Sequence, residues 1–489
     1  MTRAEAMSEP TLYELSVPGR RGVDLPDPDV PEAELPSDLL RADNGQPELS
    51  QLDVVRHYLH LSQMNYGVDG GFYPLGSCTM KYNPKINEEL AALPAFAQSH
   101  PLQAAATVQG NLALMHQLQE WLCEIGGFAA VSLQPAAGAH GELTGLLMMR
   151  AYHRARGEAG RTKVLIPDSA HGTNPASTTM AGLDVLEVPS DERGNIDLGA
   201  LRAACDATVV GLMITNPNTL GLFEERIEEV VRIVHDCGGL VYGDGANMNA
   251  LAGVVRPGDL GFDVMHFNLH KSFSTPHGGG GPGAGPVGAS ARLADYLPGP
   301  IVVETGGEED GDDARYRLAA PPRSIGRMCA FWGNFGMLVR GWAYIRQHGA
   351  EGLRANSMHA VLNANYLRVR LREAYRVPYD RVNMHELVCE GRIAGSDVHA
   401  LDVSKRLIDL GFHPPTNYFP LIVPEALMIE PTETESLQTL DAFVAAMLRI
   451  AREAIEEPET LRAAPHVTPV RRLDEVRAAR QLILCQGHL

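Results

Sequence analysis

Residues 267–283 read FNLHKSFSTPHGGGGPG, and this stretch decides the fold. It places Lys271 just after the end of an apolar strand and just before a run of glycines. In α/β proteins, ligand-binding groups gather at the carboxyl ends of parallel strands, so the segment predicts a reactive lysine at a sheet edge. A phosphate loop of the GxxxxGK type is excluded, because in that motif the glycines precede the lysine. The competing interpretation is a solvated lysine beside a flexible loop.

The chain around this segment alternates short apolar runs with amphipathic helical patterns. We expect helices at 141–156 and 224–238, and strands at 130–134, 163–167, 185–188, 209–215, 240–243 and 264–269. Strands that alternate with helices predict βαβ units, and therefore an α/β fold with a mainly parallel, seven-stranded sheet flanked by helices. The nearly continuous apolar run VVGLMI at 209–214 is typical of a strand covered on both faces.

Three parts are expected along the chain. Residues 1–100 form an N-terminal segment in which a proline-rich stretch, 18–36, predicts an extended arm, followed by a helix at 53–64. Residues 101–335 form the large α/β domain. Residues 336–489 form a smaller α+β domain. It contains most of a long helical stretch that begins near residue 328, and further helices at 397–411 and 440–456.

Composition narrows the possible partners and compartment. The chain has 489 residues, 41 Lys and Arg against 60 Asp and Glu, and a net charge of −19. This excess of carboxylates argues against sequence-independent binding to nucleic acid or anionic lipid. No apolar run approaches the length of a membrane span, and the N-terminus lacks a signal peptide. Seven cysteines without a CxxC pair predict free thiols in a cytoplasmic protein with no metal site.

Asp244 is the second chemical signal. It ends the apolar strand in LVYGDGANMNA (240–250) and stands 27 residues before Lys271. Pyridoxal phosphate (PLP) takes a lysine for its Schiff base and a carboxylate opposite its pyridinium nitrogen. A nearby negative charge keeps that nitrogen protonated, because opposite charges favour the charged form. A carboxylate in this position is also a common helix cap, which is the simpler alternative.

Three further strand ends carry complementary groups. In SLQPAAGAHGELTG (132–145) the backbone N–H groups of Ala137, Gly138 and Ala139 can approach an anion at a helix N-terminus. His171 follows the strand in IPDSAHGTNPAS (166–177), where a flat ring can stack on a cofactor. ITNPNTLG (214–221) supplies amides. A tight turn and a structural histidine are the alternatives, but the five strand ends together favour PLP.

The sequence resembles the fold-type I PLP enzymes and, within them, the lysine-bearing half of the glycine cleavage system P-protein. The matching motifs extend over most of the chain. They are YPLGSCTMKYNPK (73–85), LQPAAGAHGE (133–142), DSAHGTNPAS (168–177), TNPNTLGLFE (215–224), YGDGANMNA (242–250), NLHKSFSTPHGGGGPG (268–283), DVSKRLIDLGFHPPTNYFP (402–420) and IEPTETES (429–436). The first and the sixth of these motifs contain the most specific residues.

The resemblance implies roles for individual residues. Lys271 forms the internal aldimine with PLP, Asp244 pairs with the pyridinium nitrogen, and His171 stacks on the ring. The other implied cofactor contacts are His270 with Ala137, Gly138 and Ala139 at the phosphate, and Asn216 or Asn218 near the ring hydroxyl. Because glycine has no side chain, selectivity requires a small pocket and a carboxylate-binding group. The candidates for that group are Ser77, Cys78, Thr79 and Arg323.

The activity that the resemblance implies is decarboxylation of glycine. The aminomethyl group would pass to the lipoyl arm of the H-protein, with release of CO2. A homologous first subunit would complete an (αβ)2 heterotetramer. One alternative is another fold-type I enzyme, either an amino-acid decarboxylase or a cysteine-desulfurase-like enzyme, which would need a mobile cysteine such as Cys329. The other is a non-catalytic scaffold, and intact Lys271, Asp244 and His171 argue against it.

Overall fold

The computed structural model describes residues 9–31, 33–41, 44–276, 283–305 and 315–484. The glycines at 277–282 in the motif around Lys271 lie outside these residues. The chain divides into two compact units, one formed by the first 71 residues together with the chain from Ala463 onward, the other by Phe72–Arg462. The three-part division at residues 100 and 335 stays a prediction.

The first unit contains short helices and an extended segment. Its elements are α1 (Leu12–Leu15), η2 (Ser37–Leu39), α2 (Gln51–Met64) and α14 (Glu475–Arg480). Helix α2 begins after Ser50, whose side chain and that of Asp53 form a capping box, two residues before the predicted start. The described residues between 18 and 36 contain no helix or strand, as the proline content predicts.

The second unit is built on the predicted seven-stranded sheet. Its strands are β1 (Ala130–Ser132), β2 (Lys163–Pro167), β3 (Asp184–Val188), β4 (Val209–Thr215), β5 (Leu240–Asp244), β6 (Val264–His266) and β7 (Val287–Ala289). The order across the sheet is β1-β7-β6-β5-β4-β2-β3. All neighbouring pairs from β6 to β3 are parallel, and β7 is antiparallel to both β6 and β1. The predicted fold class is confirmed.

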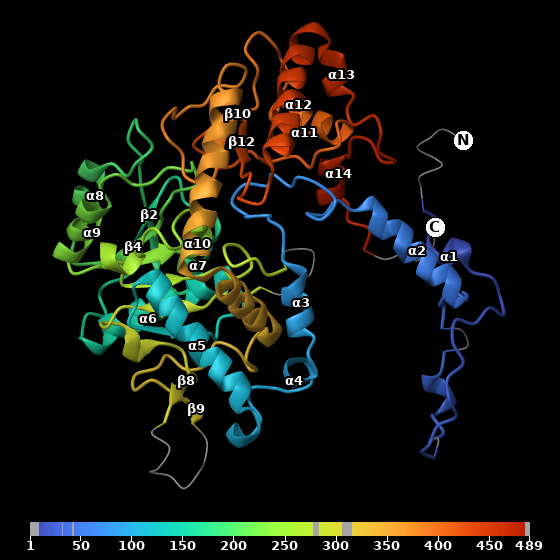
Figure 1. Ribbon diagram of the computed structural model, residues 1–489, viewed down its shortest axis with the longest axis horizontal. Helices are drawn as coiled ribbons and strands as arrows, with labels where there is room; N and C mark the ends of the chain where they lie inside the picture. Colours follow the sequence, from blue (N-terminus) through green and yellow to red (C-terminus); the bar gives the residue numbers. More distant parts are fainter. Residues whose placement is uncertain (1–8, 32, 42–43, 277–282, 306–314, 485–489) are drawn as a thin grey trace. The chain divides into compact units, whose positions relative to one another are not determined.

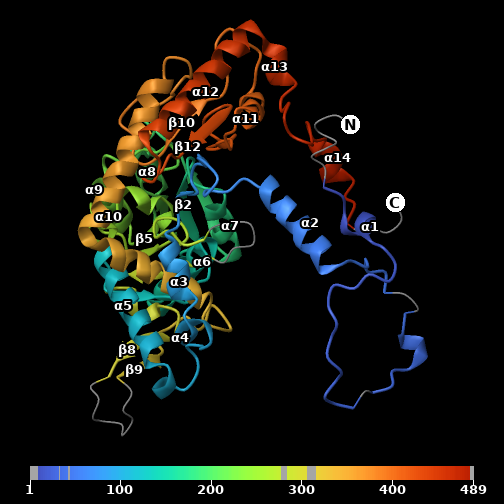
Figure 2. The ribbon, with the colours of Figure 1, turned by 45° about the vertical axis from the view of Figure 1, so that its right-hand side comes forward.

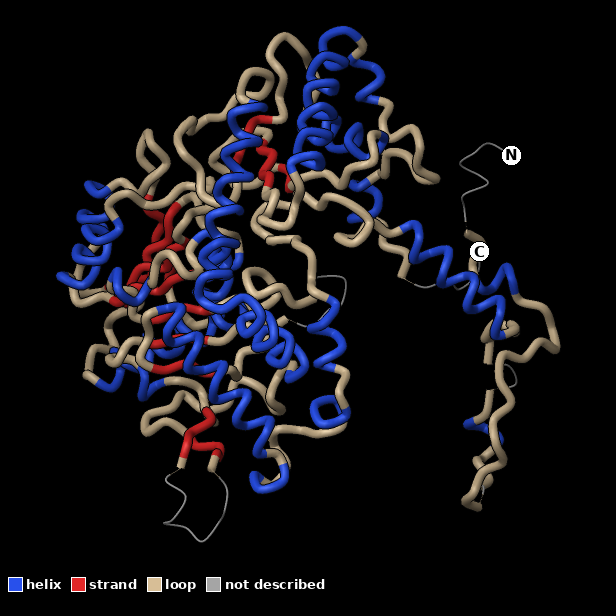
Figure 3. The backbone as a smooth tube through the Cα atoms, viewed as in Figure 1, coloured by secondary structure: helices blue, strands red, loops and turns tan. Residues whose placement is uncertain are grey.

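Helices cover both faces of this sheet, so its central strands β4, β5, β6 and β7 are buried on both sides, whereas the edge strand β3 is largely exposed (Figure 3). The helices of this layer are α5 (Gln109–Gly126), α6 (Gly138–Ala155), α7 (Thr173–Met180), α8 (Leu198–Ala204) and α9 (Ile227–Asp236). Leu165, Leu212 and Val241 pack into a core with α5 and α9. The residues next to them in sequence, Val164, Met213 and Tyr242, pack with α6 on the other face.

Helix α10 (Phe335–Leu371) connects two hydrophobic cores of the second unit (Figures 1 and 2). It bends at Gly349, where φ is 61°, a backbone angle that glycine adopts without strain. Before the bend, Leu338 and Tyr344 pack into the core of the large sheet. After it, Leu367 and Leu371 pack into a separate C-terminal core.

The C-terminal core is formed by a small sheet and its helices. Strands β10 (Leu387–Glu390), β12 (Ala426–Ile429) and β11 (Thr416–Asn417) are antiparallel, in that order. Helices α11 (Ala400–Asp409), α12 (Leu437–Glu456) and α13 (Pro458–Arg462) accompany them. The other elements of the unit are α3 (Lys85–Ala91), α4 (Pro94–Ala97), η3 (Ala105–Thr107), η4 (Gly245–Ala250), η5 (Pro257–Leu260), η6 (Ala294–Tyr296), β8 (Ile301–Glu304) and β9 (Tyr316–Ala319). Within the described residues, no helix is long and apolar enough to cross a membrane.

Candidate active site

The predicted site residues follow strands that run in the same direction, so they meet at one edge of the sheet. Asp244 is the last residue of β5, His171 follows β2, and Lys271 follows β6. Asp244 and Lys271 both act on the pKa of His171, which places the three side chains in one neighbourhood. The structure therefore brings these three side chains together at one edge of the sheet, and their shared function stays a prediction.

Lys271 is held by a loop from far away in the sequence. Its Nζ donates a hydrogen bond of 2.7 Å to the backbone carbonyl of Ser77. Ser77 and Thr79 both have positive φ, 65° and 52°, which is uncommon for residues other than glycine. Their N–H groups donate to two buried carboxylates, Ser77 to Glu386 at 2.8 Å and Thr79 to Glu430 at 2.9 Å. Loop 76–79 is thus fixed against the lysine.

Asp244 is a buried carboxylate that stays ionised. Its Oδ2 accepts from Nδ2 of Asn174 at 3.0 Å, and its Oδ1 accepts from the N–H of Ala246 at 2.9 Å. His266 Nε2 lies 3.4 Å from Oδ1. Burial raises the pKa of this carboxyl, but His266 and the two donors more than offset burial, so the pKa lies below its ordinary value.

His266 and its neighbours form a buried network behind Asp244 that the sequence reasoning missed. The hydroxyl of Tyr242 lies 2.6 Å from His266 Nδ1, and Nδ2 of Asn268 lies 2.7 Å from Nε2. Burial lowers the pKa of His266, and the nearby Asp244 carboxylate opposes this shift. Because His266 precedes Lys271 by five residues on the same strand exit, one segment supplies both the amine and the support of the carboxylate.

His171 is oriented by a chain of polar side chains. Its Nδ1 accepts from the N–H of Thr173 at 3.2 Å, and the Thr173 hydroxyl donates to Glu142 at 2.8 Å. Burial lowers the pKa of His171, so its ring is neutral and suited to stacking. Burial and nearby Asp244 raise the pKa of Glu142 to about 7. Phe419 meets the His171 ring edge-on, with centroids 5.3 Å apart.

The loop at Ala137, Gly138 and Ala139 lies at the N-terminus of α6, which begins at Gly138, three residues before the predicted start. The first N–H groups of a helix have no partner inside the helix, so they are available to an anion. A Cβ on Gly138 would fall 2.4 Å from Asn268 Oδ1, so only glycine fits. A Cβ on Gly283 would lie 3.1 Å from His270 Nδ1 and 3.3 Å from the Ala136 carbonyl, which places His270 beside this loop.

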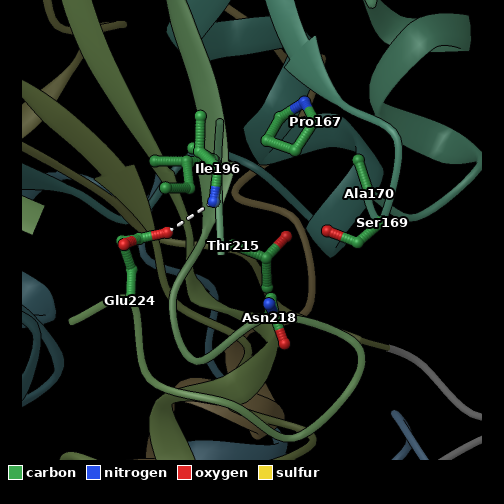
Figure 4. A pocket seen from close by; sticks show the side chains of 8 residues that line it. Pro167, Ser169, Ala170, Ile196, Thr215, Asn218 and Glu224 are labelled. Carbon is green, nitrogen blue, oxygen red and sulfur yellow. Dashed lines mark hydrogen bonds between the residues drawn. The ribbon is translucent and has the colours of Figure 1, made fainter. Parts of the chain in front are cut away.

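The two predicted asparagines follow β4, and one of them, Asn218, lies at a small cavity of about 10 Å³ (Figure 4). Asn218, with Thr215 and Glu224, lines this cavity, which has room for about one water molecule and therefore not for a substrate. Asn218 makes turn contacts, since its Oδ1 accepts from the N–H groups of Leu220 and Leu222. Asn216 accepts from the Glu224 N–H, while its buried Nδ2 lacks a partner within the described residues.

The remaining predicted residues differ in their surroundings. Arg323 lies beside Tyr296, where its Nη1 donates to the phenol oxygen at 3.1 Å. Burial raises the pKa of the Cys78 thiol to about 11, so the thiol is protonated at neutral pH and a poor nucleophile. The Cys329 thiol donates to the carbonyl of Gln134 at 3.2 Å, and burial raises its pKa as well. Neither cysteine has the thiolate character that the desulfurase alternative requires.

Another lysine, Lys81, is buried and lies next to Lys271. Its Nζ donates to Glu433 at 2.7 Å, to the carbonyl of Ser272 at 2.8 Å and to Asn249 at 2.9 Å. Burial lowers the pKa of Lys81, but Glu433 more than offsets it, so the amine stays charged. Lys81 lies in the motif GSCTMKYNP and Glu433 in the motif IEPTETES. Both motifs carry the family resemblance, but neither residue was given a role from the sequence.

Comparisons with known proteins found matches over most of the chain. The family model described as "Glycine cleavage system P-protein" matches residues 46–407, and "Glycine dehydrogenase, C-terminal domain" matches 356–470. A protein of Caldanaerobacter subterraneus named "Probable glycine dehydrogenase (decarboxylating) subunit 2" is 58% identical, over 97% of this chain and 98% of its own length. A protein of Bacillus velezensis with the same name is 55% identical, over 97% and 96%.

A solved structure is similar in fold. It is titled as glycine decarboxylase (P-protein) of the glycine cleavage system, in inhibitor-bound form. Its TM-score is 0.72 with 22% identity, over 85% of this chain and 93% of that one. At 22% identity this likeness shows the fold alone. The family model and the relatives match ranges of the sequence that include Lys271, Asp244 and His171. The chain belongs to the glycine cleavage system P-protein family.

Proposed function

We propose that this protein is the PLP-dependent, lysine-bearing subunit that decarboxylates glycine in the glycine cleavage system. The observation that carries the proposal is the meeting of Lys271 and ionised Asp244 at one edge of a parallel sheet. The names of the relatives, which cover nearly the whole chain, support the reaction. A scaffold subunit would have no need of an amine beside a buried, hydrogen-bonded carboxylate.

The residues present fit PLP. Lys271 offers an amine to the aldehyde, Asp244 offers a carboxylate that is ionised in spite of burial, and the α6 N-terminus offers N–H groups to a phosphate. The tight approach of Gly138 to Asn268 leaves this turn free of side chain. When bound, PLP supplies an electron sink for the bond that breaks in the amino acid.

The chain's own residues then have distinct tasks. Asp244, supported by Asn174 and His266, holds a proton on the ring nitrogen. Neutral His171, oriented by Thr173, offers its flat face to the ring. Loop 76–79 covers Lys271 and limits the space beside it, which suits a substrate with no side chain. Ser77, Cys78, Thr79 and Arg323 remain our candidates for the glycine carboxylate.

His270 with Ala137, Gly138 and Ala139 is proposed to hold the phosphate. Its support is the position of the His270 ring beside Ala136 and Gly283. Asn216 is preferred over Asn218 for the ring hydroxyl, because its buried Nδ2 has no partner within the described residues, whereas Asn218 is engaged by the turn. Each assignment belongs to the proposal and is tested by the loss of cofactor affinity on substitution.

Partners follow from the same proposal. Relatives named "subunit 2" support a first subunit, and we propose an (αβ)2 heterotetramer that passes the aminomethyl group to a lipoylated H-protein. On the first unit, Leu52, Val55 and Leu59 form an exposed apolar stripe along α2. In the extended arm, Val23 and Leu25 are 72% and 82% exposed. Exposed apolar residues in such number favour a protein partner.

We place the protein in the cytoplasm. Six cysteines in the described part of the chain, among them Cys78, Cys329 and Cys389, are free thiols. Free thiols of this number suit a reducing compartment. The acidic net charge of −19 gives no support for binding to nucleic acid or to anionic lipid.

The test is carboxyl exchange between glycine and labelled bicarbonate. Purified protein is mixed with the first subunit, PLP and lipoylated H-protein, and each component is left out in turn. Exchange should require this chain, PLP and the first subunit, and size-exclusion chromatography should show the two chains co-eluting. A protein that binds PLP and acts on cysteine or glutamate but not on glycine would contradict the proposed reaction.

A further inference from the structure

A cluster of three buried titratable side chains lies beside Lys271, and two of them, Glu386 and Glu430, hold loop 76–79 in the site described above. His385 and Glu386 directly precede β10, and Glu430 directly follows β12. The pairing of Leu387 with Ile429 in the small sheet brings them together. One polar atom from each lies within 4.8 Å of the other two, and all three side chains are completely buried.

The hydrogen-bond donors around the two carboxylates differ. Glu386 uses both oxygens as acceptors, because Oε2 accepts from the Ser77 N–H at 2.8 Å and Oε1 from Nδ2 of Asn247 at 3.2 Å. The Ser77 N–H can only donate, and Nδ2 of Asn247 is kept as the donor by its bond of 2.9 Å to the Pro217 carbonyl, so an ionised Glu386 fits this setting. Glu430 accepts from the Thr79 N–H through Oε2. Its Oε1 lacks a partner within the described residues and lies 3.8 Å from His385 Nε2, which lacks one as well.

A single proton accounts for two of the three unpartnered atoms of the cluster, Glu430 Oε1 and His385 Nε2, while His385 Nδ1 still lacks a partner within the described residues. If Oε1 of Glu430 carries a proton, it becomes a donor that faces Nε2 of a neutral His385. Burial lowers the pKa of His385 to about 3, so the imidazole is neutral and one of its nitrogens accepts. Burial raises the pKa of both glutamates, and Glu430 raises that of Glu386 further. The donors around each carboxyl then place the proton on Glu430.

The charges around the cluster agree with this assignment. The groups that face it are Lys271, Lys81, Glu433 and the thiol of Cys78. Lys81 is paired with Glu433 at 2.7 Å, and the Cys78 thiol is neutral. One ammonium, Lys271, is left for two carboxyls. A buried net charge is costly, so one of these carboxyls should be neutral.

We propose that His385, Glu386 and Glu430 hold one proton near neutral pH, carried by Glu430 and donated to His385, which leaves ionised Glu386 as the counter-charge of Lys271. Glu386 acts on the lysine through Ser77, whose N–H it accepts and whose carbonyl accepts from Lys271. Glu386 is therefore a positioning residue for the amine. The task of Lys271 rests on the proposed function, whereas the location of the proton does not.

Two glutamine substitutions distinguish the carboxyl that carries the proton from the one that is ionised. In Glu430→Gln the amide oxygen accepts from Thr79 and the amide NH2 donates to His385, so glutamine reproduces the protonated acid. In Glu386→Gln one amide hydrogen must face the N–H of Ser77 or Asn247, so an acceptor is lost. Glu433→Gln, which removes the partner of Lys81 and no proton, is the matched control.

The experiment uses the full chain without cofactor, slightly below neutral pH, with Glu142→Gln present in every sample, because Glu142 has a pKa of about 7 and would add a protonated-carboxyl band of its own. Infrared difference spectra, with and without 13C-labelled glutamate, should contain the carbonyl stretch of a buried protonated carboxyl. Glu430→Gln should remove this band and leave the melting temperature unchanged. Glu433→Gln should retain the band, and Glu386→Gln should lower the melting temperature.

Three outcomes would overturn the proposal. One is a spectrum of Glu142→Gln alone without the protonated-carboxyl band, and another is a band that persists in Glu430→Gln. The third is a stoichiometric metal ion in the purified protein, detected by elemental analysis, whose removal by a chelator lowers the melting temperature of the wild type but not of Glu430→Gln. Because no cofactor is present, these results stand apart from any failure of glycine decarboxylation.

Discussion

Lys271 and Ser77 lie 194 residues apart in sequence, yet the lysine ε-amine donates a 2.7 Å hydrogen bond to the serine carbonyl. The bond joins the exit of β6 in the large sheet to a loop that is itself fixed by two glutamates of the small sheet. The reactive amine is therefore positioned by both hydrophobic cores of the second unit. Substitutions in either core are expected to affect the lysine.

Asp244→Asn should retain part of the cofactor and lose activity by about 10- to 100-fold, the range that a buried charge-assisted hydrogen bond supports. Asparagine cannot hold a ring proton by charge. The measurement is the rate of carboxyl exchange between glycine and labelled bicarbonate at a series of PLP concentrations. Asp197, which caps α8 through the N–H groups of Gly199 and Ala200, gives the control. Asparagine caps as well as aspartate, so Asp197→Asn should be neutral. Equal, small effects at both positions would mean that Asp244 only caps η4.

Lys81→Met should destabilise the fold by about 3–5 kcal/mol, because it leaves Glu433 buried without its partner. Adding Glu433→Gln to this variant should recover much of the loss. Urea unfolding measures both free energies. Arg193→Met, which breaks the exposed pair with Glu225, should change stability by less than about 1 kcal/mol. If Lys81→Met behaved like Arg193→Met, the buried ion pair would not stabilise the fold.

Cys78 should react slowly with iodoacetamide at neutral pH, and Cys78→Ser should remain active. Burial raises the pKa of this thiol to about 11, so little thiolate is present. Cys237 is the internal reference, because a hydrogen bond from Cys205 lowers its pKa to about 6. Peptide mass spectrometry after timed alkylation compares the two rates. Faster modification of Cys78 than of Cys237, with loss of exchange activity, would indicate that Cys78 acts as a nucleophile in the reaction.

The stability of the protein should fall as pH rises through the titration of Glu142. The pKa of this carboxyl is about 7 in the folded chain and about 4.5 when unfolded, so the folded state binds more protons between these values. The stabilisation is fully present below the unfolded pKa and is lost as pH passes the folded one, up to about 3 kcal/mol in total. Glu142→Gln should flatten this part of the profile, measured by denaturant unfolding at several pH values. An unchanged slope would place the titration elsewhere.

Much of the fold was accessible from sequence, because strand ends and helical periodicity are local signals. The β4 run VVGLMI predicted a strand buried on both faces, and Asp244 was expected at the end of β5. Strand β7 was missed, because three residues, VGA, after a glycine-rich stretch give too short a pattern.

The residues that support the site could not be predicted from local sequence patterns. Glu386 and Glu430 are far apart in sequence, and only the pairing of β10 with β12 shows that they face one loop. His266 looked like a core residue of β6, since nothing in its neighbours in sequence indicates Asp244 or Tyr242. Asn218 was expected near the cofactor, but its side chain is engaged by its own turn, which sequence alone does not reveal.

The most direct test of the central claim is to identify the lysine that binds PLP. The protein is loaded with PLP, reduced with borohydride, digested and mapped by mass spectrometry, with Lys271→Ala beside it. Lys81, a buried lysine that lies beside Lys271, is the internal control. We predict that the pyridoxyl group is found on Lys271 and that Lys271→Ala, folded and equally stable, carries none and shows no visible cofactor absorbance. Label on Lys81, or unchanged label in Lys271→Ala, would contradict the account.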